Sequence, residues 1–410
     1  MFRYLLLLCL MGAAAGVRAE PLSFDSALDI AARTAPDVAV QAASVAALEA
    51  TSVAAGRLPD PKLALGIENL PVTGEEQWSL TRDFMTMRKI GLMQDMPNRG
   101  KRQAQTDIAA AAVTRAQVER RAQALAIRRD TAIAWLTRFY LERRAALFDA
   151  LDRENRLFAD TVRSQLIAGR AMTAETIVPQ QEAAELADRR DDLGVEIAKS
   201  KATLKRWVGD AADESLAGNP PSLAIDAEHL RTHVHEHPEL AVFVPMTEMA
   251  QAEVHAAEAM KKSDWSVELA YGRRGAAFGD MVSVQFTLGL PLFTRTRQDP
   301  LIAAKRQELN RVAAERAAML RDHTQALEGD LAEYDSLSRQ LVRMRNIRVP
   351  LARQKVDYQF ASYRAGKGDL TAVLNARREL IDQQLKQIAL EGQHAVTLAK
   401  LYYIYGEGAR

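Results

Sequence analysis

The chain of 410 residues carries the same pattern twice. Residues 36–40 read PDVAV, and residues 238–242, which lie 202 positions later, read PELAV. Further along, residues 168–170 (AGR) correspond to residues 365–367 (AGK) at an offset of 197. Later matching positions are Glu182 with Glu379, Leu204 with Leu401, and Gly209 with Gly406. The repeat predicts two copies of one structural unit, and a longer loop at residues 70–87 accounts for part of the change in offset.

Each copy contains a pair of short segments in which apolar and polar residues alternate. The segments are residues 62–69 and 88–96 in the first copy, and residues 264–272 and 281–291 in the second. Alternation with a period of two is typical of a strand that has one apolar and one polar face. Each copy is therefore expected to supply one β-hairpin, with strands of a length that crosses a bilayer when tilted.

The remainder of each copy is typical of helices. Residues 23–57 and 226–262 predict a helix before each hairpin, and residues 101–168 and 300–365 predict a much longer one after it. Residues 101–168 contain neither Pro nor Gly, so that helix would be about 100 Å long at 1.5 Å per residue. Pro350 should kink or break the second long helix. An Ala-Gly turn ends each long helix, and a shorter helix is expected after each turn.

The first nineteen residues differ from the rest. Arg3, a short apolar run and a small-x-small site predict a signal peptide at residues 1–19. We expect a first repeat at residues 20–209, a linker at 210–221 and a second repeat at 222–410. The formal net charge of +1 gives no reason to expect nucleic acid as a partner.

Four amphipathic strands cannot close a barrel by themselves, and open strand edges cannot face lipid. If these strands lie in a membrane, several chains must combine them, and three chains would give a reasonable twelve-stranded barrel. Long paired helices beside each hairpin then suggest a cylinder that continues the barrel. The alternative from the residues alone is a small four-stranded sheet that caps a helical domain.

Several segments resemble the TolC-type outer-membrane efflux family, and the order of elements is similar over essentially the whole chain after the signal peptide. The segments are LPDP at 58–61, GLMQDMP at 91–97, LGLPLF at 288–293 and YRAG at 363–366. The stretch MTMRKIG at 85–91 is similar to members that serve heavy-metal efflux, of the CusC and CzcC kind.

The resemblance implies a mixed α+β membrane protein that assembles as a homotrimer. It implies a twelve-stranded β-barrel in the outer membrane and a long α-helical barrel in the periplasm. Such a channel conducts substrates passively, here expected to be heavy-metal cations, from a periplasmic adaptor and an RND-type inner-membrane pump to the exterior. The alternatives are a tunnel for drug, solvent or protein export, and a soluble periplasmic coiled-coil adaptor.

The resemblance also directs attention to the turns after the long helices, because family members often close there with acidic residues. The family's acidic positions correspond to Ala372 and Asn375, which are not acidic. Glu175, which matches Ala372 in the first copy, and Asp369 are the acidic candidates for a cation-attracting ring. The alternative is that both acids only stabilise helix N-termini. The helix-turn tips are expected at Gly169, Gly366 and Gly368.

Two groups of side chains could bind soft or borderline metal ions. The first comprises His229, His233, His235 and His237, and the second comprises Met85, Met87, Met93 and Met96. We interpret the histidines as a polar helix face and the methionines as loop and lipid-facing residues, so no resident metal or cofactor is expected. The chain has no nucleophile elbow, Walker loop or metalloprotease helix, which predicts that it is not an enzyme.

Overall fold

The computed structural model describes residues 21–170 and 172–406, so the predicted signal peptide at residues 1–19 lies outside the described residues. The chain divides into two compact units, and each takes residues from both copies of the repeat. Unit 1 comprises residues 21–35, 127–224 and 332–402, and unit 2 comprises residues 36–126, 225–331 and 403–406, within the described part.

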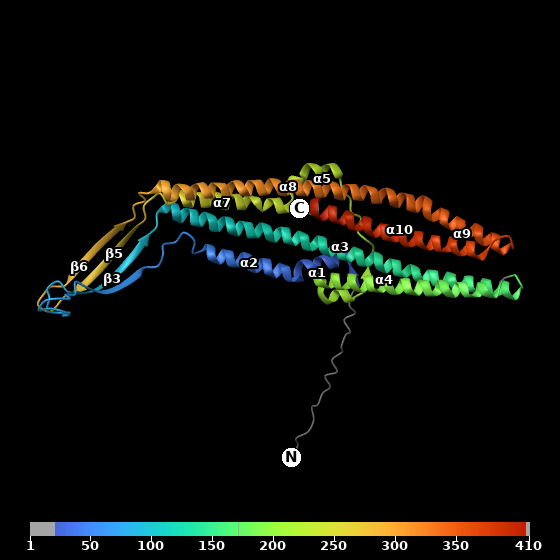
Figure 1. The fold of residues 1–410 in the computed structure, drawn as a ribbon, viewed down its shortest axis with the longest axis horizontal. Coiled ribbons are helices and arrows are strands. Elements are labelled where there is room, and N and C mark those ends of the chain that lie inside the picture. Colours follow the sequence, from blue (N-terminus) through green and yellow to red (C-terminus); the bar gives the residue numbers. More distant parts are fainter. Residues whose placement is uncertain (1–20, 171, 407–410) are drawn as a thin grey trace, which may run out of the picture. The chain divides into compact units, whose positions relative to one another are not determined.

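Unit 2 contains an antiparallel sheet of four strands in the order β2-β3-β5-β6. The strands are β2 (Lys62–Glu68), β3 (Met87–Met96), β5 (Trp265–Arg273) and β6 (Met281–Leu288). Each copy of the repeat supplies one hairpin, and β3 pairs with β5 to join the two hairpins, as the side-by-side strands in Figure 1 show. The loop between β2 and β3 is longer than the loop between β5 and β6, as the change in offset suggests.

The helices of unit 2 pack beside one another through apolar side chains. Leu240, Phe243 and Ala250 form a buried cluster with Val312 of α8. Figure 1 shows α7 running along α8. The helical elements that lie wholly in this unit are α2 (Pro36–Ser52), α5 (Ala227–His233), the 3₁₀ turn η3 (Val234–Glu236), α6 (Pro238–Ala241), α7 (Phe243–Ala259) and the 3₁₀ turn η4 (Thr294–Thr296).

Unit 1 is built from helices, with a small parallel pair of strands, β1 (Leu22–Ser23) and β4 (Leu216–Ala217). The indole of Trp135 is fully buried and donates a hydrogen bond to the Leu22 carbonyl at 3.1 Å. The helical elements that lie wholly in this unit are α1 (Phe24–Thr34), the 3₁₀ turns η1 (Thr173–Ile177) and η2 (Gly209–Asp213), α4 (Val178–Val208), the π turn η5 (Met344–Arg348) and α9 (Val349–Arg364).

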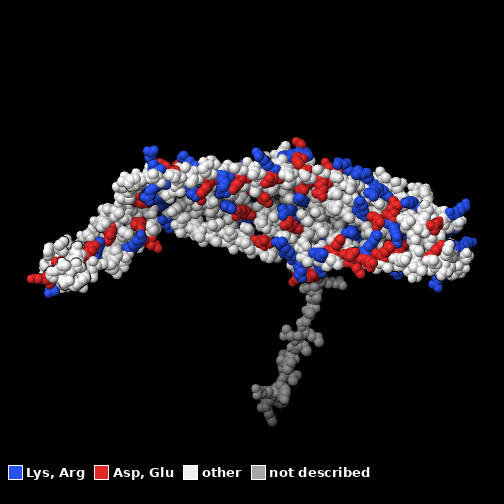
Figure 2. Space-filling model, in the orientation of Figure 1, with Lys and Arg blue, Asp and Glu red and all other residues white. Residues whose placement is uncertain are grey.

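Three helices contribute residues to both units: α3 (Arg99–Ile167), α8 (Gln298–Arg343) and α10 (Leu370–Tyr405). The helix α3 has 69 residues, close to the uninterrupted helix expected at 101–168. Basic and acidic side chains are intermingled over the helices on the face that Figure 2 shows. None of the helices in residues 21–170 and 172–406 combines the length and the apolarity needed to cross a bilayer.

Two expected helices are interrupted, and both interruptions occur at prolines. The helix expected at 23–57 is divided at Ala35 into α1 and α2, because Pro36 has no N–H for the helix ladder. Ser23 does cap α1, since its hydroxyl accepts a hydrogen bond from the Ser26 amide at 3.1 Å. The helix expected at 226–262 is divided in the same way before Pro238, where the chain passes through η3 and α6.

Pro350 does not end its helix, although a kink or break is expected there. The helix continues as α9 after the π turn η5, which occupies the five residues before Val349. A proline ring collides with the carbonyl four residues earlier in a regular α-helix, and a wider π turn removes that collision. Met344 of the turn is buried against Leu390, and Arg345 pairs with Glu391 at 2.7 Å.

Candidate functional site

The sheet of unit 2 has one apolar face, which lies exposed. Leu63, Leu92, Leu269 and Val284 lie opposite one another across the four strands. Their exposed fractions are 64%, 55%, 56% and 57%, as high as those of typical surface residues. The other exposed apolar residues on this face are Leu65, Ile67, Ile90, Trp265, Tyr271, Val282, Phe286 and Leu288. Twelve such side chains on one face form a surface suited to an apolar environment.

The opposite face of the sheet carries polar and small residues. Lys89 lies at the centre of an ion-pair network, because its ammonium is 3.0 Å from both Glu68 and Glu268. Near one end of β2, Lys62 pairs with Asp95 at 2.6 Å. The other residues of this face are Ala64, Gly66, Met87, Gly91, Met93, Ser266, Ala270, Gly272, Met281, Ser283, Gln285 and Thr287. The two faces therefore suit two different environments.

One side chain connects the two places where the sheet passes into helices. Asn98, between β3 and α3, accepts a hydrogen bond from the Lys101 amide at 3.0 Å and so caps α3. Its amide nitrogen donates to the carbonyl of Ala259 at 3.1 Å and to the carboxylate of Asp264 at 2.9 Å. Lys101 also pairs with Asp264. Sequence reasoning did not identify Asn98, although an Asn directly before an uninterrupted helix is a recognised cap signal.

The predicted helix-turn tips lie in unit 1, and the two turns have the same hydrogen bonds. Gly169 and Gly366 have φ values of 68° and 71°, in the left-handed region that favours glycine. The amide of Gly169 donates to the Leu166 carbonyl at 3.0 Å, and the amide of Gly366 donates to the Tyr363 carbonyl at 2.9 Å. The next amide in each turn donates to the carbonyl five residues earlier, from Arg170 to Gln165 and from Lys367 to Ser362. Gly368, the third predicted tip, lies in the segment that leads into α10.

The acidic gate candidates occupy different surroundings beside these turns. Glu175 lies half-buried in η1 and accepts a hydrogen bond from the Tyr363 hydroxyl at 3.2 Å. Burial and the neighbouring Glu175 carboxylate raise the pKa of Tyr363 to about 12, so the hydroxyl remains a donor at physiological pH. Asp369 is exposed directly before α10, and Asn375 is exposed within it. Glu175 therefore links η1 to α9 through Tyr363, whereas Asp369 is exposed to solvent.

A buried acid between α4 and α10 was not identified from the sequence as a site. Glu182 is 2% exposed, and its carboxylate lies 3.5 Å from the guanidinium of Arg377. Burial raises the pKa of Glu182 above its usual value, against the lowering effect of Arg377. Nearby, Arg378 pairs with Glu185 at 2.8 Å. The repeat match of Glu182 with Glu379 gave no signal of burial, because the burial depends on packing against α10.

Three of the four predicted histidines, His229, His233 and His237, border one cavity, but their rings have different partners. The rings of His229 and His233 stack with their centroids 4.0 Å apart, and the His235 side chain is 58% exposed. His237 lies instead against His323 of α8, with ring centroids 3.8 Å apart. The sequence reasoning missed His323, because 86 residues separate it from His237 along the chain.

The four methionines are spread along the sheet and its loop. Met85 is exposed in the loop before β3, whereas Met87 and Met93 lie on the polar face. Since these two are six residues apart on one strand, they are about 20 Å apart along it. Met96 alternates to the apolar face. Met87 and Met93 therefore share the face of Lys89 and lie on the side of the sheet opposite its exposed apolar face.

Comparisons with known proteins identify this architecture. Residues 236–407 match the family model described as "Outer membrane efflux protein". No curated protein sequence matches the chain. A membrane protein from Pseudomonas aeruginosa has a TM-score of 0.80 at 16% identity, over 93% of this chain and 90% of that one. VceC from Vibrio cholerae has a TM-score of 0.76 at 18% identity, over 93% and 96%. CusC has a TM-score of 0.76 at 13% identity, over 93% and 92%.

These likenesses establish that the chain shares the fold of these membrane proteins, with a sheet portion and long helices. The family match confirms the resemblance to the TolC-type efflux family, and it covers the second copy of the repeat. The family description also names the outer membrane, in agreement with the predicted location.

Proposed function

We propose that the chain is the outer-membrane channel of a three-part efflux system. Three copies form a conduit through which substrates pass without chemical change. An inner-membrane pump of the RND type supplies the substrate, and a periplasmic adaptor connects the pump to the channel. The family match and the shared fold support this class of function.

The two faces of the sheet carry this proposal. The apolar face suits contact with lipid tails, and the polar face with Lys89, Glu68 and Glu268 suits a water-filled interior. Among the described strands, β2 and β6 each pair on one side only. An unpaired strand edge is costly in lipid, so each β6 must meet the β2 of a neighbouring copy. Three four-stranded sheets then close a barrel of twelve strands.

Membrane extraction tests the location and separates the channel from a soluble adaptor. We expect the mature protein to remain in the outer-membrane fraction after an alkaline wash and to require detergent for release. A periplasmic adaptor without membrane-embedded strands would be released by the wash. Recovery of the protein in the washed supernatant would therefore contradict the channel and favour the adaptor.

Heavy-metal cations are the cargo that we propose. The support is the segment at 85–91, which resembles heavy-metal members, together with the fold shared with CusC. VceC has an equal TM-score, so the fold alone does not separate this cargo from drugs, solvents or proteins. Deletion of the gene should lower tolerance to copper, silver, zinc, cobalt or cadmium, and the intact gene should restore it. Lost tolerance to drugs or solvents with unchanged metal tolerance would favour the alternative cargo.

We also propose that Glu175 and Asp369 attract cations at the narrow end of the conduit, where Asn375 replaces an acid. Carboxylates in a narrow pore concentrate cations, because the low-dielectric wall focuses their field. In single-channel recordings, Glu175→Gln and Asp369→Asn should each lower cation selectivity. Tyr363→Phe is the matched control, because it removes the hydrogen bond to Glu175 but keeps its charge. Unchanged selectivity in both acid variants would show that these acids only stabilise the turns.

A further inference from the structure

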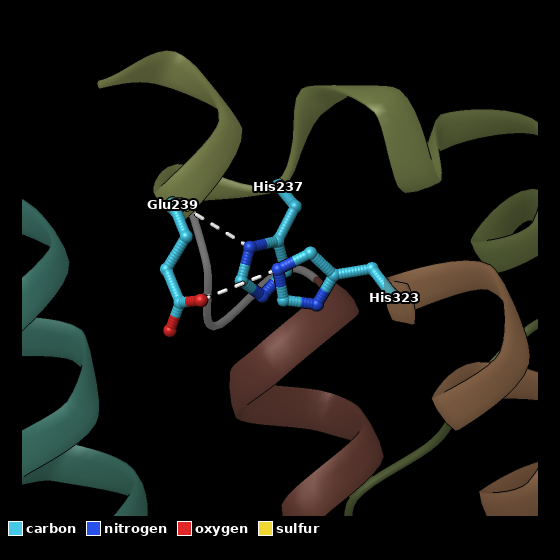
Figure 3. Close-up of side chains that lie close together, drawn as sticks. All are labelled: His237, Glu239 and His323. Carbon is cyan, nitrogen blue, oxygen red and sulfur yellow. Dashed lines mark hydrogen bonds and ion pairs between the residues drawn. The ribbon is translucent and has the colours of Figure 1, made fainter. Parts of the chain in front are cut away.

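Three side chains with metal-binding atoms converge in unit 2, away from the sheet. They are His237 at the start of α6, Glu239 within α6 and His323 of α8, and one ligand atom from each lies within 4.8 Å of the other two. Figure 3 shows the two rings face to face, with the Glu239 carboxylate beside the ring of His323. Two imidazoles and one carboxylate are a common ligand set for zinc.

The distances are close to those of a bound ion. A tetrahedral zinc ion with bonds of about 2.0–2.1 Å holds its ligand atoms about 3.3 Å apart. The Nε2 atom of His323 already lies 3.2 Å from a carboxylate oxygen of Glu239. The ring of His237 must approach these two atoms by about 1.5 Å at most, since zinc ligands are about 3.3 Å apart and these atoms lie within 4.8 Å.

The surroundings allow an ion to enter and be retained. His237 is 8% exposed and the His323 side chain is 16% exposed, so both rings are held by packing. The Glu239 side chain is 54% exposed, which leaves one side open to solvent. A cavity of about 50 Å³ borders His237 and is large enough for a water ligand.

We propose that His237, Glu239 and His323 form a binding site for a divalent cation of the zinc class. The ion would connect the short helix α6 to α8 through ligands that lie more than eighty residues apart in the sequence. The site does not depend on the proposed cargo, because it uses none of the residues assigned to the conduit.

Besides the approach of the His237 ring, binding requires a change in what its nitrogen atoms hold. The Nδ1 atom of His237 accepts a hydrogen bond from the Glu239 amide at 3.2 Å, so the proton of the neutral ring lies on Nε2. An ion that binds Nε2 must displace that proton. An ion that binds Nδ1 must take the place of the hydrogen bond from the Glu239 amide. In either case the ion competes with protons, as at other histidine sites.

Zinc titration of the detergent-solubilised full chain, after removal of metals with a chelator, tests the site. We expect one Zn²⁺ per chain, and visible absorption typical of tetrahedral coordination when Co²⁺ is used instead. His323→Ala and Glu239→Gln should each weaken binding at least about tenfold. His235→Ala is the matched control, because its side chain is exposed and pairs only loosely with Glu236 at 3.8 Å.

The stacked pair His229 and His233 is the rival site, and the double variant His229→Gln/His233→Gln distinguishes the two. This double variant should bind zinc as tightly as the unaltered chain. Loss of binding in the double variant but not in Glu239→Gln would overturn the proposal, as would absence of binding in the unaltered chain. If His323→Ala fails to fold, Glu239→Gln still tests the site. The Glu239 side chain is 54% exposed, and glutamine has nearly the same size as glutamate.

Discussion

At the scale of single residues, Glu182 makes a pH-dependent contribution to stability. Its pKa is raised by burial, so between about pH 4.5 and that raised value the folded chain holds more protons at this position than the unfolded chain. The free energy of unfolding must therefore fall as the pH rises through this interval. Glu182→Gln cannot titrate, so we expect its stability relative to the unaltered chain to increase over the same interval.

Denaturant unfolding at a series of pH values measures this difference. Glu185→Gln is the control, since it removes a carboxylate of the same helix whose side chain is 48% exposed and paired with Arg378. The control should show a smaller change with pH. A difference between Glu182→Gln and the unaltered chain that stays constant from pH 4 to pH 8 would contradict the assignment.

Asn98 is a second residue whose contribution can be measured. Asn98→Ala removes the cap of α3 and leaves the Asp264 carboxylate with fewer donors. We expect the free energy of unfolding to fall by about 1–2 kcal/mol, since a cap contributes about 1 kcal/mol and the lost hydrogen bonds to half-buried partners add to it. Gln103→Ala, which removes an exposed contact to Asp107 on the same helix, should cost less than about 0.5 kcal/mol. Equal costs for the two variants would show that Asn98 does not hold the junction.

At the scale of elements, glycine positions separate turns from helices. Gly169 and Gly194 both have open space where a Cβ would lie, but Gly169 has a φ of 68° and Gly194 lies inside α4. Gly169→Ala should therefore cost about 1 kcal/mol through backbone strain. Gly194→Ala should instead stabilise by about 0.5–1 kcal/mol, because alanine is the better helix former. Thermal unfolding of both variants measures the two signs, and the same sign in both would contradict the turn geometry.

The strands of the sheet make a similar prediction for neighbouring positions. Val284 lies on the apolar face of β6, and Gln285 lies next to it on the polar face. In lipid vesicles, Val284→Arg should lower the free energy of unfolding by about 2–4 kcal/mol, because a charge on a lipid-facing side is costly. Gln285→Arg should have little effect, since the proposed barrel has the face of Gln285 toward water. Urea unfolding in vesicles measures both variants. A larger loss of unfolding free energy for Gln285→Arg than for Val284→Arg would show that the face of Gln285 contacts lipid.

At the scale of the whole molecule, the unpaired edges of the sheet predict assembly. The β2 and β6 edges must find partners in a membrane, and three chains complete a closed set of strands. We expect the detergent-solubilised protein to have three times the mass of one mature chain by light scattering, after correction for detergent. A monomer that remains folded in lipid would contradict the proposed barrel.

Much of this architecture could be predicted because its signals are local. Alternation along residues 281–291 identifies a strand, and the absence of Pro and Gly over residues 101–168 identifies a helix, without knowledge of any partner. The interruptions at Pro36 and Pro238 were missed because each proline follows a helical pattern that continues on its far side. The π turn before Pro350 was not predicted, since a proline within a helical pattern can be accommodated by a break, a kink or a widened turn.

The sequence by itself determined the repeat, the kinds of element and the two glycine turns, since backbone propensity and polarity patterns act over a few residues. Only the tertiary structure decided which distant side chains meet. It brought His323 to His237, Arg377 to Glu182 and Asn98 to Asp264. Each pair joins segments far apart in the chain, and contacts of that kind follow from the packing of helices and the register of strands, which no local pattern contains.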